Sequence, residues 1–118
     1  MNINSEQLVQ QAYKTANDLK AIDPLILDVR EHCSFTDYFL ICSASSHPQL
    51  SAIEENIHRK FKGMGVHLFT PCLKTEDSCW LLMDYGDFIV HIFMEEARQF
   101  YNLEQLWKRS PQVEPQCC

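Results

Sequence analysis

Two aspartates, Asp84 and Asp87, stand three positions apart on either side of Gly86, between two apolar segments. Carboxylates this close could hold Mg²⁺ for nucleotidyl transfer, a reaction that also needs a phosphate-binding loop beside them. The sequence has no Walker-type glycine-rich loop and no glycine–serine turn with a D-x-D pair downstream. A tight turn accounts for both aspartates, because Asp side chains bond the turn backbone and glycine adopts a positive φ. We favour the turn, with the Mg²⁺ site as the alternative.

Thiol and hydroxyl side chains show no clearer catalytic pattern. Cys42 and His91 could pair as nucleophile and base, but a core thiol and a strand histidine are the simpler interpretation. Ser43, Ser45 and Ser46 precede an expected helix and suit a turn and an N-cap, and no G-x-S-x-G motif is present. No two histidines are spaced i, i+4. We therefore predict no catalytic residue, no metal site and no cofactor, and expect that the protein is not an enzyme.

The six cysteines are dispersed along the chain and include no CxxC pair. Structural zinc sites need such short spacings, so the sequence does not predict one. Cys33, Cys42, Cys72 and Cys79 are interpreted as buried, reduced thiols, since a free cysteine packs as a small hydrophobic residue. Cys117 and Cys118 end a polar, proline-containing segment and are expected to be exposed.

The charge balance argues against broad nucleic-acid binding. Ten Lys and Arg against sixteen Asp and Glu give a net charge of -6. Phosphate-binding surfaces need clustered Lys and Arg, so direct nucleic-acid recognition is not expected, whereas an acidic protein can dock onto a basic one. No apolar run approaches the roughly 20 residues that span a bilayer, and residues 1–7 lack the features of a signal peptide. The expected location is cytoplasmic, with no membrane partner.

Hydrophobic periodicity predicts alternating helices and strands. The expected elements are a helix with Ser5 as its N-cap over 5–20, strands at 25–29, 37–42 and 66–71, a helix from Pro48 to Gly63, a hairpin of strands 80–83 and 88–93, and a helix at 95–101. This order predicts a single α/β domain at residues 1–108, with packed helices on a mixed sheet of about five strands. Residues 109–118 are expected to form a disordered tail.

The hairpin is apolar on both faces. Trp80 and Leu82 are expected to point to one face, and Leu81 and Met83 to the other. Such a sheet must be covered twice, either by the protein's own helices or by a partner. The pattern alone leaves both possibilities open.

At this hairpin the sequence resembles the ribosomal silencing factor family, also called Iojap-related. The resemblance is carried by 80–87 (WLLMDYGD), 90–93 (VHIF), 96–98 (EAR), Tyr101 and 103–107, and upstream by 27–30 (LDVR), 37–42 (DYFLIC) and 43–46 (SASS). These segments keep the family's order over nearly the whole chain. Two positions depart from the family pattern: residues 75–79 lack the common Glu-Gly pair, and 47–49 (HPQ) lack a basic residue.

The resemblance implies an α/β fold distantly similar to nucleotidyltransferases, without their catalytic residues. It implies a factor that binds ribosomal protein L-fourteen on the large ribosomal subunit and sterically blocks joining of the small subunit. This would repress translation when nutrients are scarce or during subunit maturation.

Carried onto this chain, the family's contact surface implies a partner-binding set from the hairpin. The set comprises Trp80, Leu81, Met83, Asp84 and Tyr85, to which we add Asp87 as a rim charge. Asp28 and Asp37 also match family positions but are interpreted as structural. Two other functions stay open: an Mg²⁺-dependent enzyme of nucleotidyltransferase type, and a structural homodimer that buries the same apolar face.

Overall fold

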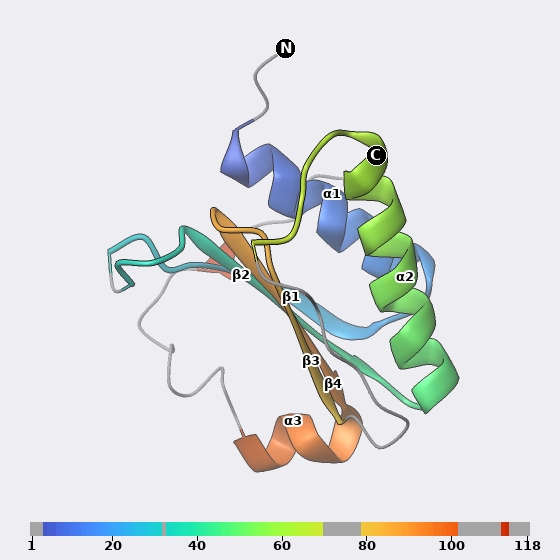
Figure 1. Ribbon diagram of the computed structural model, residues 1–118. Helices are drawn as coiled ribbons and strands as arrows, with labels where there is room; N and C mark the ends of the chain where they lie inside the picture. Colours follow the sequence, from blue (N-terminus) through green and yellow to red (C-terminus); the bar gives the residue numbers. More distant parts are fainter. Residues whose placement is uncertain (1–3, 32, 70–78, 102–111, 114–118) are drawn as a thin grey trace.

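The computed structural model describes residues 4–31, 33–69, 79–101 and 112–113. In these ranges the chain forms one α/β domain around a mixed sheet, as predicted (Figure 1). The elements in chain order are α1 (Ser5–Asp18), β1 (Ile22–Asp28), β2 (Tyr38–Ala44), α2 (His47–Gly63), β3 (Trp80–Asp84), β4 (Phe88–Met94), α3 (Glu95–Tyr101) and β5 (Gln112–Val113).

The strands lie in the order β3-β4-β2-β1-β5. The two central strands, β2 and β4, are parallel, and Tyr38 lies opposite Phe88. Helix α2 follows β2 and carries the chain across one face of the sheet, which allows this parallel pairing. The neighbouring pairs β3–β4, β1–β2 and β1–β5 are antiparallel.

Helices α1 and α2 lie together over one face of the sheet (Figure 1). Both helices turn an apolar stripe inward, because their buried residues recur at three- and four-residue spacing. The buried apolar residues are Leu8, Val9, Ala12 and Ala16 in α1, and Leu50, Ile53, Ile57 and Phe61 in α2. This packing forms the larger core, and the two predicted helices are confirmed.

We call the opposite side of the sheet the outer face. Its smaller core consists of Leu27, Val29, Phe39, Ile41, Ile89 and Phe93, packed with Ala97 of α3. Arg98 fastens this short helix to the sheet by donating from Nη1 to the carbonyl oxygen of Ile22 (3.0 Å) and to Oγ of Ser43 (3.1 Å). Because α3 has seven residues, it covers a limited part of the outer face.

The N-cap of α1 differs by one residue from the prediction. Asn4 caps the helix, since its side-chain oxygen accepts from the backbone N–H of Gln7 (2.8 Å). Gln7 returns the contact by accepting from the N–H of Asn4 (3.1 Å), which completes a capping box. Ser5 instead lies in the first turn, and its hydroxyl donates to Asp37 (3.1 Å). Two adjacent residues with capping side chains explain why the pattern misplaced the start.

The predicted strand at 66–71 is wrong for residues 66–69, which form no strand, and residues 70–71 lie outside the described ranges. After α2 the chain turns back at Gly65 (φ 76°), and the N–H of Val66 donates to the carbonyl oxygen of Phe61 (2.8 Å). Val66 and Leu68 then pack against the larger core. The closing bonds at the helix end hold this segment against the helices.

The sheet instead gains the two-residue strand β5, which pairs with β1 and lies within the segment expected to be a tail. The rest of that segment, 109–111 and 114–118, lies outside the described residues. None of the helices formed by the described residues combines the length and apolar character needed to cross a membrane.

Candidate interaction surface

The hairpin of β3 and β4 stands at one edge of the sheet, and its turn is built by Asp84 and Gly86. The side-chain Oδ1 of Asp84 accepts from the N–H of Gly86 (2.8 Å), where φ is 85°. The N–H of Tyr85 donates to the carbonyl oxygen of Phe88 (3.0 Å) and closes the turn. A residue with a side chain is strained at this φ, so glycine is required here. The predicted turn role of Asp84 is confirmed.

Three of the six predicted contact residues lie in the core. Leu81 (1% exposed) and Met83 (0%) point toward α1 and α2, because alternate residues of a strand face opposite sides. Tyr85 is buried as well, and its ring stacks on that of Phe88 with centroids 5.0 Å apart. These side chains hold the hairpin to the fold and offer no surface to a partner.

The other hairpin face is accessible. Trp80 and Leu82 lie on the outer face with 36% and 43% of their surface exposed, while Asp87 is exposed and Asp84 half-buried at the turn. The sequence placed Trp80 and Leu82 on one face, which is confirmed. Leu82 was not among the predicted contact residues, although the same alternation that pairs it with Trp80 was its signal.

Two residues of β4 hold the Trp80 side chain. The indole lies on the ring of Phe93, with centroids 4.9 Å apart and planes inclined by 24°. Its Nε1–H donates to Nδ1 of His91 (3.2 Å). Because Phe93 lies directly opposite Trp80 and His91 two residues earlier in β4, both groups are on the outer face.

His91 was missed as a member of this cluster. It is 4% exposed, and burial lowers its pKa to about 4, so the imidazole is neutral near pH 7. Since Nδ1 accepts from Trp80, the proton of the neutral ring resides on Nε2. That nitrogen is buried and has no hydrogen-bond partner among the residues that the structure describes. The imidazole of His91 also packs edge-to-face against the ring of Phe39, with ring centroids 4.9 Å apart.

The structure separates Cys42 from His91. Cys42 pairs with Ile92 and belongs to the core beneath α1 and α2, whereas His91 faces outward. Burial raises the pKa of the Cys42 thiol to about 12, so it stays protonated. The two groups cannot act as nucleophile and base, and the interpretation of Cys42 as a core thiol is confirmed. The same interpretation is wrong for Cys79, which is exposed, and Cys33 is only partly buried.

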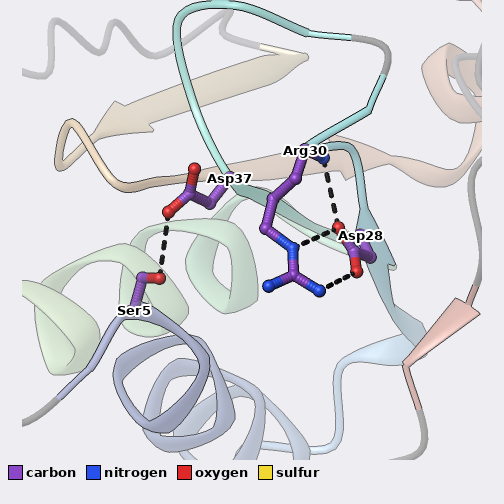
Figure 2. A network of polar contacts seen from close by, with 4 residues as sticks. All are labelled: Ser5, Asp28, Arg30 and Asp37. Atoms are coloured by element: carbon purple, nitrogen blue, oxygen red, sulfur yellow. Dashed lines mark hydrogen bonds and ion pairs between the residues drawn. The ribbon is translucent and has the colours of Figure 1, made fainter.

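Asp28 and Asp37 make contacts within the fold (Figure 2). Asp28 binds the Arg30 guanidinium through both oxygens, at 2.9 Å from Nε and 2.6 Å from Nη2, which lowers the pKa of this carboxyl. Asp37 accepts from Ser5, so it joins the first turn of α1 to the start of β2. Within the described ranges, no three His, Cys, Asp or Glu side chains are grouped so that they could hold a metal ion. These contacts support a structural interpretation of both aspartates.

Comparison with known proteins agrees with this architecture. Residues 2–117 match the family described as ribosomal silencing factor during starvation. The ribosomal silencing factor of Halalkalibacterium halodurans is 32% identical over 112 residues, covering 95% of both chains. That of Haemophilus influenzae is 37% identical over 100 residues, covering 85% of this chain and 97% of its own.

Solved structures show the same fold. A protein from Bacillus halodurans superimposes with a TM-score of 0.79 at 33% identity, covering 92% of this chain and 98% of its own. A protein from Chromobacterium violaceum superimposes with a TM-score of 0.85 at 23% identity, covering 98% and 95%. With a family match over nearly its whole length and relatives above 30% identity, this chain belongs to the ribosomal silencing factor family.

Proposed function

We propose that this protein binds the large ribosomal subunit in the cytoplasm through ribosomal protein L-fourteen. Bound there, it blocks association with the small subunit and so represses translation. The relatives named as ribosomal silencing factors support the regulatory part of this proposal. The docking surface is the exposed part of the outer face, centred on Trp80 and Leu82.

The accessible pair Trp80 and Leu82 is the observation that carries the proposal. Large apolar side chains exposed side by side on a sheet supply the desolvated contact area on which binding hot spots depend. Asp87 lies exposed at the adjoining turn, and the whole chain carries a net charge of -6. An apolar centre next to an exposed aspartate, on a chain of negative net charge, suits a basic ribosomal protein, because complementary charge accelerates encounter and sets orientation.

The proposed mechanism is steric occupancy and involves no bond making or breaking. Leu81, Met83 and Tyr85 take supporting roles, since they anchor the hairpin in the core. Asp84 holds the turn and Asp87 serves as a rim charge. A folded domain on the large subunit then occupies space that the small subunit needs.

Sucrose-gradient sedimentation of purified ribosomal subunits tests this function. We expect the protein to travel with the large subunit and to reduce the joined-ribosome peak. The Trp80→Ala/Leu82→Ala double variant should keep the fold, measured by circular dichroism, and lose cosedimentation. Met64→Ala is the matched control, because Met64 is 37% exposed but is the C-cap of α2, which lies on the other side of the sheet from the outer face.

Failure of the wild-type protein to cosediment would contradict the proposed partner. Cosedimentation of the double variant at wild-type levels would contradict the proposed surface. Light scattering on the same variants measures whether the outer face also joins two copies of the chain. A dimer abolished by the double substitution, together with normal subunit joining, would favour the homodimer alternative.

A further inference from the structure

We propose that His91 is a positioning residue for docking, because it holds the Trp80 indole in one orientation and satisfies the indole N–H. This inference rests on the proposed function, in which Trp80 contacts the partner. It adds a residue that is itself buried and makes no contact with that partner. It also specifies the chemistry of the partner group that covers Trp80.

This inference depends on the different hydrogen bonding of the two ring nitrogens of His91. Nδ1 accepts from the Trp80 indole at 3.2 Å, while the buried Nε2 has no partner within the described ranges of the chain. A buried donor without an acceptor destabilises the folded protein, and each such group in a native structure calls for a reason. Phenylalanine is of similar shape and would sit among Phe39 and Phe93 without that penalty. The interaction that histidine adds and phenylalanine lacks is the bond to Trp80.

That bond prepares Trp80 for contact in two ways. Stacking on Phe93 restricts the ring plane, and the hydrogen bond selects which edge of the indole faces inward. An immobilised side chain loses less conformational entropy when a partner binds it. The bond also pairs the indole N–H before docking, so a partner can cover Trp80 without leaving a buried donor unsatisfied.

The required partner chemistry follows from this pairing. Because the indole N–H already has its acceptor, the partner group over Trp80 needs no acceptor of its own. An apolar side chain, or the apolar stem of a Lys or Arg, is sufficient and fits a basic partner. Trp80 therefore acts as a flat apolar contact, and its polar edge is directed back into the protein.

The test compares stability with affinity for purified large ribosomal subunits in wild type, His91→Phe, His91→Asn and Trp80→Ala. His91→Phe removes the acceptor and the orphaned donor together. We expect its urea midpoint to equal or exceed that of wild type and its affinity to fall about three- to tenfold, the range associated with one immobilised side chain. His91→Asn keeps an acceptor near the position of Nδ1 but leaves empty space. It should bind more tightly than His91→Phe although it is less stable.

A purely structural role of His91 predicts the opposite relation, with affinity following stability. Wild-type affinity of His91→Phe, alongside weakened binding of Trp80→Ala, would overturn the positioning role and leave the proposed surface intact. Equal affinities of wild type and Trp80→Ala would overturn the surface itself. If His91→Asn does not fold, the affinities of His91→Phe and wild type still test whether His91 is a positioning residue.

Discussion

The Gln49 side-chain amide of α2 joins the start of that helix to the carbonyl oxygen of Leu19, the C-cap of α1, at 3.2 Å from Nε2. Nε2 also donates to the carbonyl oxygen of Lys20 (3.0 Å), and Oε1 accepts from the N–H of Ser45 (2.8 Å). One side chain thus connects two helix termini that lie 30 residues apart. Gln49 occupies the segment that departs from the family's common basic residue, and these contacts give it a local structural role.

Gln49→Ala is therefore expected to lower the free energy of unfolding by about 1–3 kcal/mol, because it unpairs backbone groups at both helix ends. Urea denaturation monitored by circular dichroism measures the change. Gln11→Ala, in the middle of α1, is the control and should change stability by less than about 0.5 kcal/mol. Equal effects of the two substitutions would contradict this role of Gln49.

Adjacent leucines of β3 provide a matched pair. Leu81 is 1% exposed and Leu82 is 43% exposed, on opposite faces of the same strand. Leu81→Ala should lower the free energy of unfolding by about 2–5 kcal/mol through lost burial and the remaining cavity. Leu82→Ala should cost less than about 1 kcal/mol in stability. Thermal or urea unfolding of both variants measures the difference, and a reversed order would show that the strand alternation is assigned to the wrong faces.

Stability is expected to depend on pH through His91. Its pKa falls from 6.5 to about 4 on burial, so between these values the unfolded chain binds more protons than the folded protein. The contribution of His91 is complete above pH 6.5 and is lost as the pH falls toward 4, with a slope of up to about 1.4 kcal/mol per pH unit. Unfolding measured from pH 7 to 4.5 should show this loss in wild type and a smaller one in His91→Phe. If the free energy of unfolding depended on pH in the same way in both proteins, the loss of stability could not be assigned to His91.

Lys20 offers a stabilising substitution. It follows the C-cap of α1 with φ at 62°, a left-handed conformation that glycine adopts without strain. Lys20→Gly should raise the free energy of unfolding by about 0.5–1 kcal/mol, after allowance for the greater freedom of glycine in the unfolded chain. Lys14→Gly, at an exposed position inside α1, should lower it by about 1 kcal/mol. Chemical denaturation compares the two, and a loss at both positions would contradict the strain assigned to Lys20.

Local patterns were sufficient for the elements whose signals lie within a few residues. Hydrophobic periodicity predicted α2 between Pro48 and Gly63, and the turn residues around Gly86 predicted the hairpin. Strand pairing depends on contacts between distant segments. This explains why residues 66–69, with an apolar strand-like composition, pack as a non-strand segment, and why the two-residue β5 was not predicted.

In the candidate site, too, the local sequence pattern predicted some features, while others depend on contacts between distant segments. Alternation along β3 separated Trp80 and Leu82 from Leu81 and Met83, but it could not say which pair lies inward. That choice depends on where α1 and α2 pack, a property of the assembled fold. The contact between Trp80 and His91 could not be predicted from the sequence either, since it depends on the register between β3 and β4.

The parallel pairing of β2 with β4 constrains the order in which the nascent chain can fold. Tyr38 lies opposite Phe88, a residue synthesised 50 positions later, so β2 cannot form its hydrogen bonds to β4 until those 50 residues have been added. Closing such a long loop slows folding relative to local hairpins and helices. His91 and the ring beneath Trp80 belong to the late strand. A nascent chain therefore cannot complete its outer face before β4 has been synthesised, so the proposed docking surface forms only after residues 88–94 are available to pair with β2.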